Sequence, residues 1–185
     1  ALADWIGHDQ VVTSGGSSTL VKEALVPPLL FPFAAPRVFG TLADAGPEAE
    51  SQTRLLLWSV ERTIAALSAI GTDTHVDHRL HVVLPGSPNR GIFGGDGAYG
   101  EVKAALDAIV NRWRSEPAWA QRVTLAHPRI GWVRGTGLMC GNDPLVEAVE
   151  AAGVRTWSTD EIAGELVGLC AAPVRAEAAA APVTA

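Results

Sequence analysis

The sequence is poor in features that mark several protein classes. Its two cysteines, Cys140 and Cys170, are isolated and fit no metal or redox spacing, so we expect free thiols in a reducing cytoplasm. A net charge of −6 gives no reason to expect nucleic acid, whose binding proteins carry basic patches. The longest apolar run, residues 24–35, is broken by prolines and too short to span a bilayer, and the first residues show no signal peptide. We therefore expect a cytoplasmic globular protein that binds neither nucleic acid nor membrane.

The 185 residues, of which 48% are hydrophobic, suffice to bury the core of one domain. A proline at the start and a glycine just past the end predict a long helix from Pro47 to about Ile70, closed by Gly71 and carrying an apolar stripe. Ser158 and Glu161 form a capping box that predicts a further helix, to about residue 170. The other expected elements are a helix over 1–7, a loop over 11–18, strands over 28–33, 82–84 and 123–126, helices over 99–114 and 144–153, and a mobile tail from 171 onward.

The most informative stretch reads HVVLPGSPNRGIFGGDGAYGEVK. Its apolar start predicts a buried parallel strand that stops at a Pro-Gly pair. Ser87 follows at the carboxyl end of this strand, and after a glycine-rich loop come Tyr99 and Lys103, whose spacing places them on one helix face. A strand-end serine that faces a Tyr-xxx-Lys helix is the reactive arrangement of a carbonyl reductase.

The chemistry of ketone reduction explains these residue types. A hydride is added to carbon and a proton to oxygen, so a general acid must lie within hydrogen-bond reach of that oxygen. We assign this acid to Tyr99, whose pKa, ordinarily about 10, would be lowered by the ammonium of Lys103. Ser87 would donate a hydrogen bond to the same oxygen as charge develops there. A bare Tyr-xxx-Lys pair is usually a surface pair, but the strand-end serine before it favours catalysis.

Three other motifs have plainer interpretations. The loop containing Gly15-Gly16 lacks the pattern of a phosphate-binding loop, which favours a surface loop. His75, His78 and His81 have the spacing of a metal site, but no helix would hold them on one face, and we expect no metal. The run Arg134-Gly135-Thr136-Gly137 resembles half of a dinucleotide fingerprint. It lacks the third glycine, and no acidic residue ends a following strand, so it is not predicted to be the primary phosphate loop.

The spacing of serine, tyrosine and lysine resembles the short-chain dehydrogenase/reductase superfamily. More specifically, LPGSPNRGIFGGDGAYGEVK, NRW, IGWVRGTGLM and GVRTWSTDEIA resemble the ketoreductase domain of type I fatty acid synthases of the fungal and actinobacterial kind. The likeness covers about residues 29–170. It implies a Rossmann-like, doubly wound α/β fold and NADPH-dependent reduction of 3-oxoacyl chains on acyl carrier protein. It also implies contacts with other synthase domains and a homo-oligomer, by resemblance a homohexamer.

The resemblance also implies where the cofactor binds. Small residues at the end of strand 28–33 would lie beside the adenosine ribose and nicotinamide, although packing explains them equally well. Backbone groups of residues 131–133 would hold the nicotinamide carboxamide, and a threonine hydroxyl would lie near the phosphates or the amide. With the catalytic tyrosine and lysine, which would bind the ribose, the expected set is Ala34, Ala35, Tyr99, Lys103, Gly131, Trp132, Val133 and Thr136.

In two respects this sequence departs from the family. The family often has an asparagine on the long helix that supports the lysine through a water. Ser59 lies near that position here, so the support behind Lys103 would come from Ser59 or a backbone group.

The family's first strand, glycine-rich turn and helix, which bind the pyrophosphate, and its closing strand have no recognisable counterpart. We therefore expect residues 1–175 to be the catalytic part of a ketoreductase domain and residues 176–185 a flexible tail. Such a fragment alone would bind NADPH weakly or not at all. Three functions stay open: 3-oxoacyl reduction within a synthase, reduction of another carbonyl substrate such as a polyketide or a sugar, and a structural or docking role without catalysis.

Overall fold

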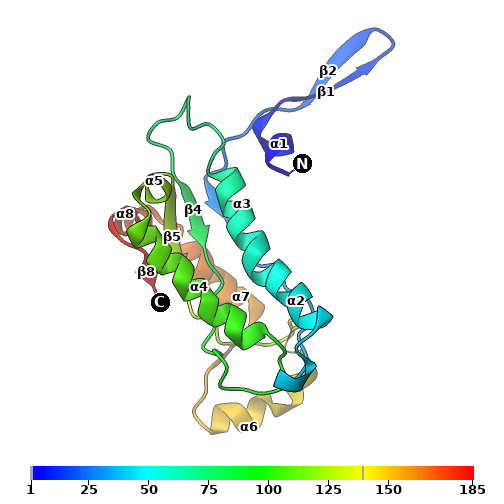
Figure 1. Cartoon of the computed structure of the whole chain (residues 1–185), viewed down its shortest axis with the longest axis vertical. Helices are drawn as coiled ribbons and strands as arrows, with labels where there is room; N and C mark the ends of the chain where they lie inside the picture. The colour runs from blue at the N-terminus through cyan, green and yellow to red at the C-terminus, as the bar shows by residue number, and fades with distance from the viewer. Residues whose placement is uncertain (1, 139) are drawn as a thin grey trace.

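The computed structural model describes residues 2–138 and 140–185, and helices and strands alternate along most of this part of the chain (Figure 1). In chain order, the elements are α1 (Leu2–Gly7), β1 (Gln10–Ser14), β2 (Ser17–Lys22), β3 (Leu29–Leu30), η1 (Leu42–Asp44), α2 (Pro47–Thr53), η2 (Arg54–Trp58), α3 (Ser59–Leu67), β4 (Leu80–Val83), α4 (Tyr99–Ser115), α5 (Pro117–Ala120), β5 (Val123–His127), β6 (Trp132–Val133), η3 (Cys140–Leu145), α6 (Val146–Ala151), β7 (Thr156–Trp157), α7 (Thr159–Gly168), α8 (Ala172–Ala180) and β8 (Val183–Thr184).

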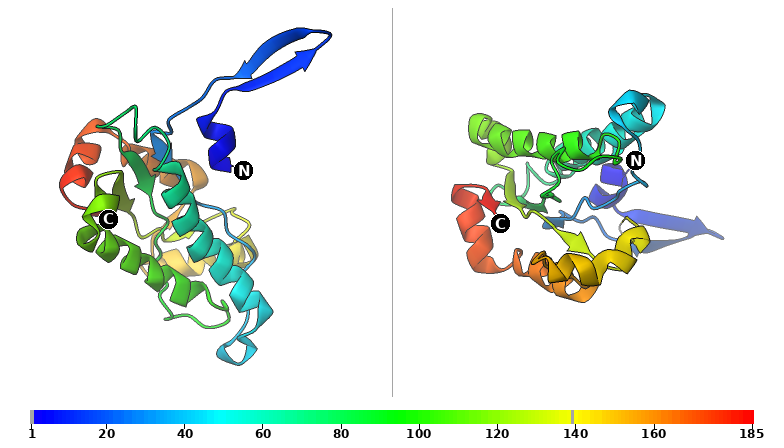
Figure 2. Two further views of the ribbon diagram at one scale, coloured as in Figure 1. Left: turned by 45° about the horizontal axis from the view of Figure 1, so that its top comes forward. Right: turned by 90° about the horizontal axis from the view of Figure 1, so that it is seen from below.

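The centre of the molecule is a parallel sheet of four strands in the order β3-β4-β5-β8. Helices cover both faces of this sheet: α3 and α4 lie on one side, and α7 and α8 lie on the other (Figure 2). A short parallel pair, β6 with β7, lies apart from the main sheet. The three layers confirm the predicted α/β class with a parallel, Rossmann-like sheet.

The two central strands, β4 and β5, are buried along their whole length. Nearly continuous apolar runs of this kind are typical of parallel strands that are covered on both faces. His81 is accommodated within β4 because its Nδ1 lies 2.8 Å from the Thr124 hydroxyl and its Nε2 lies 3.1 Å from the Leu169 carbonyl. Both polar atoms of this buried ring therefore have partners, as burial requires.

The long helix predicted over residues 47–70 is present as α2, η2 and α3 in succession. Its apolar side joins the hydrophobic core with β4, β5 and α4. In its middle, η2 is a π turn, in which the amide of Ser59 donates to the carbonyl of Arg54, five residues earlier. α3 ends at Leu67, short of the predicted end, and Gly71 lies in the turn that follows at φ +75°, where a Cβ would meet Val26 Cγ2 at 2.7 Å, so a glycine is needed there.

Residues 10–22 form a β-hairpin, so the predicted loop over 11–18 is wrong. β1 and β2 pair antiparallel, and the hairpin projects away from the rest of the molecule (Figure 1). Gly15 and Gly16 adopt φ values of +58° and +80°, which a two-residue turn of type I′ requires and glycine adopts at low cost. A Gly-Gly pair between runs rich in β-branched residues is itself a hairpin signal.

The predicted tail is also wrong, because residues 172–184 form α8 and β8. Ala178 of α8 is fully buried, so this alanine-rich helix is stabilised by packing rather than by an apolar stripe. β8 pairs in parallel with β5, placing Val183 beside Ala126 and Thr184 beside His127. The sheet therefore has a strand beyond β5, where the sequence predicted none. A strand of two residues is too short to show a periodicity.

Smaller differences concern the ends of elements. The helix expected from Pro144 begins at Val146, after the 3-10 turn η3, and the strand expected over 28–33 is limited to Leu29–Leu30. The capping box is confirmed, because the Ser158 hydroxyl accepts from the Glu161 amide at 3.2 Å. Within the described residues, no helix combines the length and the apolar character that a membrane crossing needs.

Candidate active site

Ser87 lies just past the carboxyl end of β4, as predicted, and is only 7% exposed. Its Oγ accepts a hydrogen bond from the Asn89 amide at 3.1 Å, which leaves the hydroxyl proton available for a second partner. The preceding residue, Gly86, lies against the backbone of the segment that follows β5. A Cβ at Gly86 would lie 2.6 Å from the Pro128 carbonyl oxygen, so no larger residue fits without displacing the serine.

The loop between Ser87 and α4 is held by polar contacts that the sequence does not reveal. Asn89 Nδ2 donates to Asp96 Oδ2 at 2.8 Å, and the Ala98 amide donates to Gln52 Oε1 at 2.8 Å. Gln52 is buried on α2, 46 residues before its partner. These contacts fix the point at which α4 begins, and with it the position of Tyr99. The one signal for them is that Gln52 lies four residues before Leu56, on the helix face that carries the apolar stripe.

Lys103 is buried on α4 and lies with its Nζ 5.2 Å from the centroid of the Tyr99 ring. Its ammonium donates to the carbonyl oxygen of Pro85 at 2.6 Å, two residues before Ser87. Burial lowers the pKa of Lys103 from 10.5 to about 8. The structure thus brings the serine, the tyrosine and the lysine together at the carboxyl end of β4.

The electrostatics of Tyr99 differ from the expectation. Burial raises the pKa of Tyr99 above its ordinary value of 10, the hydrogen bond with Ser87 opposes this shift, and the negative charge of Asp96 adds to it. The net direction is upward, whereas the sequence predicted a pKa lowered by Lys103. The main reason is that the phenol is buried, and burial disfavours the charged phenolate. A raised pKa keeps the phenol protonated at rest, which suits an acid that donates its proton to a ketone.

The hydrogen-bond partner of Lys103 is a backbone carbonyl and not Ser59. The Ser59 hydroxyl donates to the Leu55 carbonyl within its own helix. The partner of the Lys103 ammonium is instead the Pro85 carbonyl. Of the two alternatives left open by the sequence, the backbone group is the one in contact with the lysine.

The expected cofactor-binding residues lie on the same edge of the sheet. Ala34 and Ala35 are exposed and follow β3, which runs parallel to β4. Residues 131–133 are half-buried and follow a backbone contact in which the Ile130 amide donates to the Gly86 carbonyl at 3.2 Å. Thr136 is half-buried, and its hydroxyl donates to the Val133 carbonyl at 3.1 Å. In open α/β sheets, ligands bind at the carboxyl ends of the strands.

Comparison with known proteins relates this arrangement to a synthase. The fatty acid synthase alpha subunit hexA of Dothistroma septosporum is 43% identical over 159 residues, which are 80% of this chain and 9% of that protein. The fatty acid synthase subunit alpha of Saccharomyces cerevisiae is 41% identical over 145 residues, 76% of this chain and 8% of that protein. The chain therefore spans about a tenth of the length of these relatives. Over most of its length it is thus related to one segment of the fungal fatty acid synthase alpha subunits.

Solved structures show that the chain has the fold of the short-chain dehydrogenases. It matches 4-hydroxyisoleucine dehydrogenase complexed with NADH at a TM-score of 0.69, with 15% identity over 86% of this chain and 67% of the other. A short chain dehydrogenase from Bacillus anthracis gives 0.62, with 15% identity over 85% and 61%. A putative 2-deoxy-D-gluconate 3-dehydrogenase from Agrobacterium tumefaciens with bound NADP gives 0.67, with 16% identity over 85% and 65%. No family model matches the chain.

The three histidines with metal-like spacing do not converge in the structure. His75 Nδ1 lies 2.9 Å from the Thr74 hydroxyl, and His78 Nε2 lies 3.0 Å from the Pro27 carbonyl. The ring of His81 is occupied within the sheet. Among residues 2–138 and 140–185, no three histidine, cysteine or acidic side chains group as metal ligands. Cys170 is a free, half-buried thiol, and the side chain of Cys140 lies outside the described part of the chain.

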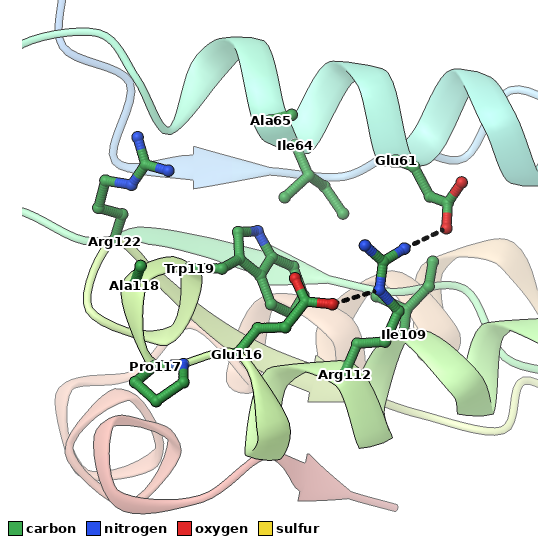
Figure 3. A pocket seen from close by; sticks show the side chains of 10 residues that line it. All are labelled: Glu61, Ile64, Ala65, Ile109, Arg112, Glu116, Pro117, Ala118, Trp119 and Arg122. Atoms are coloured by element: carbon green, nitrogen blue, oxygen red, sulfur yellow. Dashed lines mark hydrogen bonds and ion pairs between the residues drawn. The ribbon is translucent and has the colours of Figure 1, made fainter.

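A pocket of about 530 Å³ lies between α3 and the end of α4, away from the candidate active site (Figure 3). Arg112 projects between two carboxylates there: its Nη1 donates to Glu61 at 3.1 Å and its Nε to Glu116 at 2.8 Å. This ion-pair network joins the two helices on the outside of the core. The pocket contains none of the three residues that a carbonyl reduction needs, so we do not assign the active site to it.

Proposed function

We propose that this domain is a 3-oxoacyl-acyl-carrier-protein reductase that uses NADPH within a type I fatty acid synthase. One observation supports this most: Ser87, Tyr99 and Lys103 meet at the carboxyl end of β4, in a chain 43% identical to a fatty acid synthase alpha subunit. The serine and tyrosine provide the two donors that a ketone oxygen needs, and the lysine provides a nearby positive charge.

Each residue would act at a defined atom of the substrate. Ser87 accepts from the Asn89 amide and is hydrogen-bonded with Tyr99, and when substrate binds its proton would bond to the 3-oxo oxygen instead. Tyr99 would transfer its proton to that oxygen, and its raised pKa keeps the proton in place until negative charge develops. The Lys103 ammonium, 5.2 Å from the ring centroid, would stabilise the phenolate that remains.

The residues present fit the nicotinamide half of a dinucleotide, which when bound supplies the hydride. Trp132 Nε1 is buried and has no hydrogen-bond partner among the described residues, so a polar ligand at this edge would give it one. The backbone of residues 131–133 and the Thr136 hydroxyl would hold the carboxamide, and Lys103 with Tyr99 would hold the ribose. Ala34 and Ala35 are small and exposed, which would let the cofactor approach the end of β3.

The partners follow from the same proposal. The substrate would arrive on acyl carrier protein, and the other domains of the synthase would surround this one. Support comes from the relatives, of which the chain spans 8–9%. A homohexameric assembly in the cytoplasm is proposed on the same grounds.

The experiment measures loss of NADPH absorbance during reduction of an acetoacetyl thioester. It uses the intact synthase chain of which this domain is proposed to be a part, called the full-length chain below. We compare the native chain, Tyr99→Phe and a matched control, Glu101→Gln, an exposed residue on the same helix. We expect Tyr99→Phe to lower kcat by about two to four orders of magnitude, the scale for losing a general acid. The control is expected to retain its activity.

The other outcomes separate the alternatives. If the native chain binds NADPH but does not reduce the thioester, the substrate is a different carbonyl compound, such as a polyketide or a sugar. If it neither turns over nor binds NADPH, the domain is a structural part of the synthase. A Tyr99→Phe chain as active as the native one would refute the assigned acid.

A further inference from the structure

A buried histidine contacts the segment that precedes Ser87. His127, at the end of β5, is 3% exposed, and its Nδ1 lies 3.2 Å from the Leu84 carbonyl oxygen. Its ring also packs against Gly86, where a Cβ would lie 2.8 Å from the ring Cε1. With the Lys103–Pro85 hydrogen bond, the three residues before the serine each have a fixed contact. The ring therefore helps to fix the position of Ser87 beyond the carboxyl end of β4.

The second nitrogen of this histidine is bound by a carboxylate from the catalytic helix. His127 Nε2 lies 3.0 Å from Asp107 Oδ1, and Asp107 Oδ2 pairs with Arg90 in the loop after Ser87. Asp107 is four residues beyond Lys103, which is itself four residues beyond Tyr99, so the three side chains lie along one face of α4. One carboxylate thus joins β5, α4 and the loop that follows the serine.

The Asp107 side chain matters because it gives the second nitrogen of the buried ring a polar partner. The Leu84 carbonyl and the Asp107 carboxylate only accept hydrogen bonds, so each contact is a hydrogen bond when the ring nitrogen facing it carries a proton. Burial lowers the pKa of His127, the Leu84 carbonyl opposes this shift, and three nearby cations lower the pKa further. The Asp107 side chain is the partner at the other ring nitrogen. Without this partner, the ring loses the contact that fixes its plane against Gly86.

We propose that Asp107 and His127 are positioning residues that hold Ser87 at the correct distance from Tyr99 and Lys103. They act through the serine segment and do not touch the substrate. This role rests on the proposed carbonyl reduction, and it deepens that proposal by adding a structural support that the Ser-Tyr-Lys pattern does not include.

A double-mutant cycle in the full-length chain tests this role. The kcat for acetoacetyl thioester reduction is measured for Asp107→Leu in the native background and in the Ser87→Ala background. In the native background we expect a loss of about tenfold or more in kcat, with KM changed less than about threefold. In the Ser87→Ala background, Asp107→Leu is expected to cost less than about threefold, because there is no serine hydroxyl left to misplace. Asp107→Asn keeps an acceptor for the ring and should restore most of the activity, while Glu101→Gln is the matched control.

The results distinguish this inference from the proposed function. If Ser87→Ala and Tyr99→Phe leave turnover intact, the proposed function itself fails. If those variants are impaired but Asp107→Leu keeps the native kcat, only the positioning role is overturned. An equal loss in both backgrounds would mean a general structural effect and would also overturn it. If Asp107→Leu does not fold, Asp107→Ser removes the carboxylate without adding apolar bulk. The kcat of this variant is then measured in the same two backgrounds.

Discussion

Raising the pH through 8 is expected to switch off ketone reduction, because the ammonium of Lys103 is lost there. The side chain is 6% exposed, and this burial lowers its pKa from 10.5 to about 8. The protonated form is the active one, so activity is present below the pKa and is lost as the pH rises through it. Tyr99 does not titrate in this window, because its pKa is raised from 10.

The size of the effect follows from a single titration. At pH 7, about ten elevenths of Lys103 carries its charge, and at pH 9 about one eleventh does. We therefore expect kcat/KM for an acetoacetyl thioester to fall about tenfold between pH 7 and pH 9. An unperturbed lysine, with a pKa of 10.5, would show almost no change over the same range.

The assay is the initial rate of NADPH consumption by the full-length chain at constant ionic strength, from pH 6.5 to 9.5. The rate of Tyr99→Phe is subtracted, so that NADPH consumed elsewhere in the synthase is not counted. Lys103→Arg keeps its charge throughout, and its residual activity is expected to be flat over this range. A native profile that is flat through pH 9, or a fall that Lys103→Arg shares, would refute the reasoning.

Two further predictions concern the fold around the site. Gly86→Ala places a Cβ 2.6 Å from the Pro128 carbonyl and 2.8 Å from the His127 ring, so we expect a loss of about tenfold or more in kcat, on the scale of displacing an oxyanion donor. Gly94→Ala, in the same loop but with open space around it, is the control, and equal activity of the two variants would contradict the close-approach argument. Ser158→Ala removes the capping box of α7 and is expected to destabilise that helix by about 1 kcal/mol, seen as faster amide hydrogen exchange in α7. Ser158→Asp retains a cap and should keep the protection, so equally fast exchange in both variants would rule out the capping contribution.

The parts of the site that could be predicted are those encoded over short distances in the sequence. The strand that ends before Ser87, and the helix face that carries Tyr99 and Lys103, depend on local apolar runs and four-residue spacing. The Ser158–Glu161 capping box is equally local, and the structure contains it. For each of these, neighbouring residues determine the conformation with little help from the rest of the chain.

The parts that could not be predicted depend on contacts between distant residues. The Gln52–Ala98 hydrogen bond and the Asp107–His127 pair join elements 46 and 20 residues apart. β8 is a strand only because β5 offers it backbone partners. The pKa of Tyr99 was predicted in the wrong direction because spacing shows that a lysine is near but not that the folded chain buries the phenol and places Asp96 close to it.

The π turn in the long helix has a consequence for the site some distance away. Each α-helical residue advances the chain by about 100°, so the one extra residue of η2 sets the angular phase of α2 relative to α3. Deleting it would turn α2 by that angle and carry Gln52 away from the Ala98 amide, while the apolar stripe of α3 stayed in the core. The extra residue therefore sets the rotation of α2 relative to α3. With it, the helix can bury its apolar stripe and also place Gln52 against the Ala98 amide at the start of α4, which a uniform α-helix would not allow together.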